Sequence, residues 1–230
     1  MNLHRRLEAT VLAVSLLLAT TASSGMLLQR KGQDFDLVAS ANPATPHSSD
    51  TDRTAMFDRG RGKRTQADAV ASSSATCNGC SGTATAVQVI SFGKARKGTA
   101  DNLANAWSTC NNCRATSVSI QVILIRPGAT VTARNRALAA NVGCSGCSTT
   151  AVAVQLVVVT SKRDSLSRQA RKDLEALAAQ LESELQGATR TKAARTAAAK
   201  NKPGLARIQT LVRQELKPSE IRPNFTLKTG

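Results

Sequence analysis

The chain has 230 residues, enough for one or two domains with a core of ordinary size. Aromatic residues make up only 2% of it and tyrosine is absent, so a core must consist of Val, Ile, Leu and Ala, and recognition by base stacking is disfavoured. The net charge of +16 favours an anionic partner. With so few aromatics, we expect an anionic cell-envelope polymer or membrane surface in preference to a specific nucleic acid.

Residues 1–28 have the composition of an export signal. A basic start with Arg5 and Arg6 precedes an aliphatic run, and the small residues Ala22 and Ser24 provide a cleavage site. An uncleaved anchor over residues 9–28 is the alternative, because about twenty apolar residues can cross a bilayer. Both interpretations place the rest of the chain outside the cytoplasm, either secreted or anchored.

Residues 29–75 are predicted to form a disordered linker. Pro, Ser, Thr, Asp and Gly dominate, and the apolar residues show no sustained period. Such a segment can bury too little apolar surface to offset the loss of backbone entropy. A basic run from Arg59 to Arg64 is interpreted as a solvated part of this linker, with a polyanion contact or a processing site as alternatives.

Residues 76–160 contain a threefold repeat, and such a repeat governs the interpretation of the fold. Each copy is a Cys-x-x-Cys motif followed by an apolar run with alternating faces, which indicates a β-strand. The motifs hold all the cysteines, as the pairs Cys77 and Cys80, Cys110 and Cys113, and Cys144 and Cys147. Each strand also repeats a threonine (Thr83, Thr116, Thr150) and a glutamine (Gln88, Gln121, Gln155).

The repeated glutamines are interpreted as a structural row at one level of a single sheet. We expect them to hydrogen bond to each other or to backbone, because an unpaired buried amide costs about 1–3 kcal/mol. Ala-rich stretches at residues 101–107 and 135–141 precede the second and third motifs. Their composition favours short helices, which would make the long strands parallel. Short strands, with each motif capping a hairpin, are the alternative.

Residues 161–230 are predicted to form a C-terminal helical pair with a basic tail. Leucines and alanines recur at helical spacing from Leu166 to Leu185, and Gly187 ends the pattern. A second helix is expected from Leu205 to Leu216. The predicted fold class is therefore α+β or small α/β, with three repeated units in one sheet, two C-terminal helices and a disordered N-terminal linker.

Three interpretations of the cysteines remain open. A disulfide within each motif suits an exported chain, because adjacent cysteines of one turn can meet without moving the backbone. Two motifs could instead form a zinc site with four cysteine ligands, although the intervening segments are longer than in common zinc ribbons. Thiol–disulfide exchange is the third, but the motifs precede strands and no histidine recurs beside them. Apart from zinc, no cofactor is expected.

Catalytic constellations are missing from the sequence. The only histidines are His4 and His47, so there is no H-E-x-x-H metal motif and no histidine-based triad. No phosphate-binding glycine loop occurs either. The chain is therefore predicted not to be an enzyme.

The arrangement resembles an exported actinobacterial family of unknown function. The resemblance rests on Asn135 to Ala139, Cys144 to Cys147 and Thr149 to Gln155, on the matching segment from Asn102 to Gln121, and on a helical end from Ser165 to Leu216. Some members carry the automatic label of a peptide zinc metalloprotease. That label implies a peptidase, which the residues of this chain do not support.

The sequence thus predicts an exported, non-enzymatic structural or interaction protein of the cell envelope with a basic surface. In this interpretation the cysteine pairs act as structural staples. A zinc-binding or thiol-redox protein that uses the same cysteines is the alternative.

Overall fold

The computed structural model describes residues 32–188 and 204–230, and the predicted export segment at residues 1–28 lies outside them. The described elements are β1 (Gly32–Ala41), β2 (Ser49–Arg59), β3 (Arg64–Ala75), β4 (Ser81–Ser91), β5 (Lys97–Ser108), β6 (Arg114–Ile125), β7 (Thr130–Asn141), β8 (Ser148–Val159), α2 (Arg168–Ala188), α4 (Leu205–Leu216) and β9 (Glu220–Thr229).

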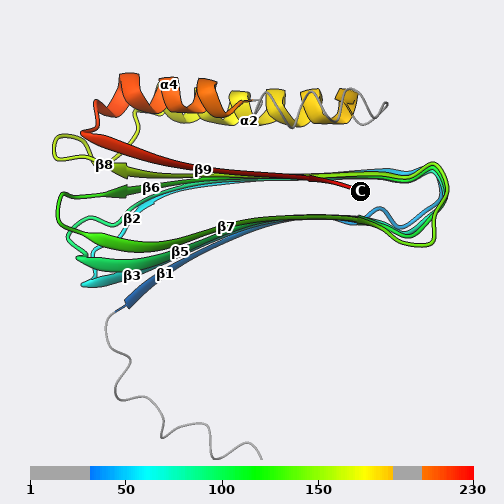
Figure 1. Cartoon of the computed structure of the whole chain (residues 1–230), viewed down its shortest axis with the longest axis horizontal. Coiled ribbons are helices and arrows are strands. Elements are labelled where there is room, and N and C mark those ends of the chain that lie inside the picture. Colours follow the sequence, from blue (N-terminus) through cyan, green and yellow to red (C-terminus); the bar gives the residue numbers. More distant parts are fainter. Residues whose placement is uncertain (1–31, 189–203) are drawn as a thin grey trace, which may run out of the picture. The chain divides into compact units, whose positions relative to one another are not determined.

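The strands alternate between two stacked sheets (Figure 1). Sheet A has the order β1-β3-β5-β7, sheet B has the order β2-β4-β6-β8-β9, and every pair except β8–β9 is parallel. Gly32 pairs with Arg64, Arg64 with Lys97 and Lys97 with Thr130, so each coil is 32 or 33 residues further along the chain. The described chain is a β-solenoid of four coils, numbered here 1 to 4 from β1–β2 to β7–β8.

The predicted fold class, an α+β or small α/β protein with one sheet, is wrong. The Ala-rich stretches at residues 101–107 and 135–141 are not helices but lie in β5 and β7, which return the chain through a second sheet. Alanine favours helices in isolation, but here alternate residues of both stretches pack against sheet B. Tertiary packing therefore overrides the local preference. The long strands are nevertheless parallel.

The predicted disordered linker also contains regular structure, because β1, β2 and β3 all lie within residues 29–75. In β1 and β3 small buried residues, such as Ala39, Ala67 and Ala71, alternate with polar or exposed ones. This is the alternation of a half-buried strand, but alanine makes it weakly apolar. The first coil extends the repeat without cysteines.

Side-chain size sets the distance between the two sheets. Near the Cys-x-x-Cys turns the space between them is filled by Ala, Ser and Asn, whereas near the opposite turns it holds larger side chains such as Phe92, Ile123 and Val157. The sheets accordingly lie close together at the cysteine turns and separate toward the other end (Figure 1). The inner faces form a wedge-shaped core.

The outward face of sheet B is covered by α2 and α4. Val118, Ile120 and Val122 of β6 pack in one cluster with Leu174 and Leu181 of α2 and the apolar side of α4. The two predicted helices are present. The basic tail, in contrast, contains β9, which pairs antiparallel with β8. The outward face of sheet A has no such cover among the described elements.

Neither described helix is long and apolar enough to cross a membrane.

Candidate functional site

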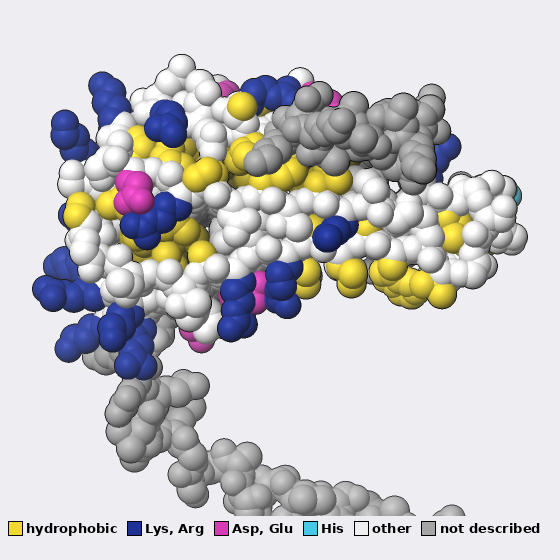
Figure 2. Space-filling model, viewed as in Figure 1, with side chains coloured by type: hydrophobic (Ala, Val, Ile, Leu, Met, Phe, Trp, Pro, Cys, Tyr) yellow, Lys and Arg dark blue, Asp and Glu magenta, His cyan; other side chains and the backbone are white. Residues whose placement is uncertain are grey.

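Basic residues gather where the chain passes from sheet B to sheet A. The turns at residues 60–63, 92–96 and 126–129, with the strand starts and the segment after β8, place exposed cations at this end. We call it the basic end and define it by Arg61, Lys63, Arg64, Lys94, Arg96, Lys97, Arg126 and Lys162. Figure 2 shows Lys and Arg concentrated at the end of the solenoid where the sheets are far apart.

Buried neighbours orient the cations of the basic end. In the turn between β4 and β5, Phe92 and Ala95 are buried, and the Ala95 N–H donates to the Phe92 carbonyl oxygen at 2.9 Å. Lys94 and Arg96, on either side of Ala95, are exposed. Gly93 has a φ of +56° and passes so close to the Gly60 carbonyl that a Cβ atom would clash with it. The turn therefore has one compact conformation that presents two cations to solvent.

Most of the positive charge at the basic end is uncompensated. Among the described residues, Arg126 shares the carboxylate of Asp164 with Arg59, at N–O distances of 3.9 and 2.7 Å, whereas the other seven cations form no ion pair. Arg64 and Lys97 are also direct cross-strand partners on neighbouring strands. Like charges at such positions, about 5 Å apart, repel each other. An incoming anion would relieve this repulsion.

A groove extends the basic end over the outward face of sheet A. It has a volume of about 470 Å³, and its lining includes Arg64, Lys97, Gln66, Thr99 and Thr132. The cations can hold a phosphate, sulfate or carboxylate group, and the hydroxyl and amide groups can hydrogen bond to neighbouring oxygens. Asp34 also lines the groove, which limits how far an anion can extend toward β1.

The opposite end carries the cysteines and almost no charge. The turns at residues 42–48, 76–80, 109–113 and 142–147 contain no Lys, Arg, Asp or Glu. Each cysteine pair forms a disulfide within its own motif, with Cα–Cα distances of 5.4, 5.7 and 6.1 Å. The charge of the solenoid is therefore strongly asymmetric along its strands.

The disulfide turns stack on one another because they share one backbone conformation. The third residue of each turn has a positive φ, +59° at His47, +70° at Gly79, +56° at Asn112 and +69° at Gly146. In coil 1 this turn has Thr45 and Ser48 where the next coil has Cys77 and Cys80. The disulfide sulfur of Cys113 lies 3.1 Å from the Cys77 carbonyl oxygen of the coil before it.

The predicted zinc alternative would need cysteines from two motifs at one point. The cysteines instead pair within each motif, and the described residues contain no group of three or more His, Cys, Asp or Glu side chains arranged around a metal.

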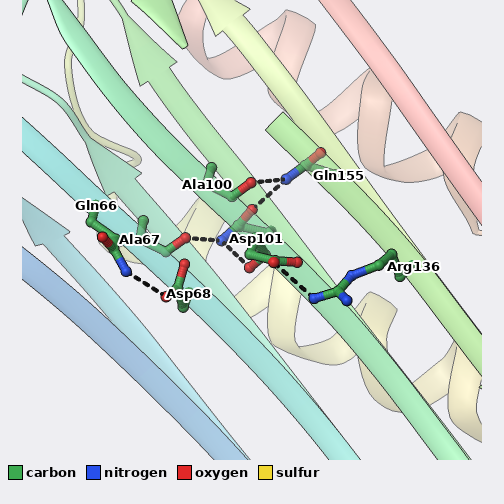
Figure 3. A network of polar contacts seen from close by, with 8 residues as sticks. Gln66, Ala67, Asp68, Ala100, Asp101, Arg136 and Gln155 are labelled. Carbon is green, nitrogen blue, oxygen red and sulfur yellow. Dashed lines mark hydrogen bonds and ion pairs between the residues drawn. The ribbon is translucent and has the colours of Figure 1, made fainter. Parts of the chain in front are cut away.

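The three repeated glutamines lie together between the sheets. The Gln121 amide N–H donates to Gln88 Oε1 at 2.8 Å, and the Gln155 amide N–H donates to Gln121 Oε1 at 2.7 Å. The same amides donate to sheet A carbonyls, including that of Ala100 (Figure 3). Met56 occupies the corresponding position of coil 1. The ladder joins sheets and coils and has no access to solvent.

One ion pair fixes α2 to the first two coils. Glu182 is 2% exposed and accepts hydrogen bonds from Arg53 at 2.6 and 2.8 Å and from the Thr85 hydroxyl at 2.8 Å. The hydrogen bond to Glu182 raises the pKa of the Arg53 guanidinium above its ordinary value. The outer end of the Arg53 side chain is half exposed. This pair is a structural contact rather than a reactive one.

Sequence reasoning located the cysteine and glutamine rows but missed the basic end. Its signal was available, since basic residues recur in the segments 61–64 and 94–97, one coil apart, immediately before β3 and β5. The first of these segments lies in the predicted linker, so the prediction of disorder hides the periodicity. Comparisons with protein-family models, curated proteins and solved structures found no match.

Proposed function

We propose that the protein is an exported, non-enzymatic structural or interaction protein of the cell envelope that binds an anionic polymer through the basic end. The observation that carries the proposal is the asymmetry of charge: seven cations without an ion pair among the described residues lie at one end, and the four turns at the other end have no charged Lys, Arg, Asp or Glu. Such a one-sided field attracts and orients a polyanion. The polymer would enter along the groove at Arg64 and Lys97.

Two further observations support the setting. Disulfides persist in oxidising compartments, so the three intramotif bonds favour a place outside the cytoplasm. The same bonds close the turns far from the basic end, as staples would. The resemblance to exported actinobacterial proteins agrees with this setting.

The test is retention on immobilised dextran sulfate in a salt gradient, with sedimentation of phosphatidylglycerol vesicles as the membrane arm. The variant Lys94→Gln/Arg96→Gln/Lys97→Gln removes three charges from the basic end. Its matched control, Arg114→Gln/Arg134→Gln/Lys228→Gln, removes three exposed charges elsewhere. We expect the first variant to elute at clearly lower salt and the control to elute close to the natural protein.

Equal elution of the two variants would mean that only net charge matters and would contradict a site at the basic end. If the protein binds the vesicles but is not retained on dextran sulfate, its ligand is a lipid surface and not a polymer. Unchanged far-UV circular dichroism and melting temperature confirm that each variant is folded.

A further inference from the structure

A stack of coils ends in strand edges with unpaired backbone groups, and two of these edges are sealed. At the first coil, the Ser40 and Asn42 N–H groups donate to the carboxylates of Asp52 and Asp50 at 2.7 and 2.6 Å. Inward-pointing charges of this kind protect a strand edge from pairing. At the last coil, β9 pairs along β8 and covers its edge, so that β9 is the outer strand of sheet B.

The edge of β7 differs from both of these. It is the last strand of sheet A, and the N–H groups of Thr130 and Val142 donate toward the β5 side, to Arg96 and Ser108. Because N–H groups of a strand alternate in direction, those of the odd-numbered residues from 131 to 141 point away from β5. No described strand pairs with β7 on that side, where the Thr226 hydroxyl donates to the Asn135 carbonyl oxygen at 3.4 Å and Gly230 lies against the Asn141 main chain.

β9 limits what can occupy the vacant position beside β7. It extends sheet B one strand beyond sheet A, so a position beside β7 and opposite β9 has no strand among the described elements. A second solenoid cannot continue the stack there, because its own strand of sheet B would occupy the place of β9. A single extended segment has no such second strand and fits the position.

The last glutamine of the ladder pairs in register with Asn224 of β9. Gln155 is 1% exposed, and its Oε1 has no hydrogen-bond partner within residues 32–188 and 204–230, although the corresponding oxygens of Gln88 and Gln121 each accept from the next coil. The amide nitrogen of Gln155 points back to Ala100 and the oxygen points the other way (Figure 3). The ladder thus ends at the last coil in an acceptor without a donor among the described residues.

The side chains around the position define its occupant. Arg134 and Arg136 are exposed on the outward side of β7, where Arg136 already pairs with Asp101 of β5 at 2.8 Å. Leu138 and Val142 follow, and they are 57% and 59% exposed. We propose that the β7 edge binds one extended segment of a partner protein by strand addition, with an acidic residue beside Arg134 and apolar or small residues beside Arg136 and Leu138. Main-chain hydrogen bonds would give affinity, and alternate side chains would give specificity.

The first strand of the chain itself provides a probe of this chemistry. Residues 32–41, GQDFDLVASA, place Asp34, Asp36 and Val38 on one side of β1. Continuing the register of the solenoid would set Asp36 of such a peptide beside Arg134, because both lie four residues after the start of their strands, Gly32 and Thr130. The peptide alone lacks β2 and so avoids the conflict with β9.

The experiment is a fluorescence anisotropy titration of the labelled peptide with the full-length, oxidised protein. We expect saturable binding. Ala139→Pro removes one N–H from the open edge without breaking a bond to β5, and we expect it to weaken binding at least tenfold. Arg134→Glu/Arg136→Glu should do the same, whereas the control Arg168→Glu/Lys172→Glu, with the same change in net charge on α2, should not.

Three outcomes would overturn the proposal. These are the absence of saturable binding up to about 1 mM protein, binding that neither β7 variant weakens, and equal binding of a peptide whose two aspartates are lysines. If the protein self-associates and Ala139→Pro abolishes this association, the occupant of the β7 edge is a second copy of the chain. That result would contradict the argument that β9 excludes a second solenoid. If Ala139→Pro is unfolded by circular dichroism, the arginine variants still decide the question.

Discussion

Replacing each ladder glutamine by methionine tests whether the amide row stabilises the solenoid as a connected network. Methionine has nearly the volume of glutamine, and Met56 already occupies the equivalent position of coil 1, so packing changes little. The three variants differ in which buried amide groups lose their partners. We expect Gln121→Met to be the most destabilising.

Gln121 is the central member and makes contacts on both sides. Its amide donates to Ala67 O, Gln88 Oε1 and Asp101 O, and its Oε1 accepts from Gln155. Gln121→Met therefore leaves Gln88 Oε1 buried without a donor. The orphaned acceptor costs about 1–3 kcal/mol and the lost bonds cost about 1 kcal/mol. We therefore expect the free energy of unfolding to fall by about 3 kcal/mol.

The end positions should cost less. Gln88→Met removes one of three acceptors for the Gln121 amide and orphans no side-chain group, so about 1 kcal/mol is expected. Gln155→Met leaves Gln121 Oε1 without a donor, which destabilises the protein. It also removes Gln155 Oε1, which already lacks a partner among the described residues, and this part of the change stabilises the protein. The double variant Gln88→Met/Gln121→Met should cost at least about 1 kcal/mol less than the sum of the singles.

Urea unfolding of the oxidised protein at pH 7 gives the free energies, with the m-value as a check on two-state behaviour. If Gln88→Met and Gln121→Met destabilise equally, or if their effects add, the amides act as separate side chains and the network reasoning is refuted.

Three further predictions concern the staples and the helix cover. Alkylation of the unreduced protein should modify none of the cysteines, and intact mass should show all six modified only after reduction in denaturant; stoichiometric zinc or free thiols would contradict the staples. Thr45→Cys/Ser48→Cys should form a fourth disulfide in coil 1 and raise the free energy of unfolding by about 2 kcal/mol, the chain-entropy value for so short a loop, and free thiols in this variant would show that the turns are not equivalent. Arg53→Met should cost about 3 kcal/mol by leaving the Glu182 carboxylate buried without its cation, and adding Glu182→Gln should recover most of the loss; no recovery would mean that Arg53 contributes through packing.

The cysteine turns and the glutamine row could be predicted, because their residue types have few alternatives. Cysteines three apart in a turn can close without moving the backbone, so local geometry favours intramotif disulfides over the zinc and thiol-exchange alternatives. The glutamines recur at one level of an apolar strand, and buried amides must find partners. The basic end could not be found this way, because its residues come from separate turns whose common position depends on the coil.

The sequence by itself determined the repeat, its alternating strands, the cysteine turns and the two C-terminal helices, since each is a local pattern of spacing and side-chain type. Only the tertiary structure decided that the Ala-rich segments are strands, that the assumed linker contains the first coil, and that β9 closes one edge and leaves another open. Alanine's local preference is weak, and it yields to burial between two closely packed sheets. Which edge remains unpaired depends on contacts between residues far apart in the chain, and no local pattern specifies them.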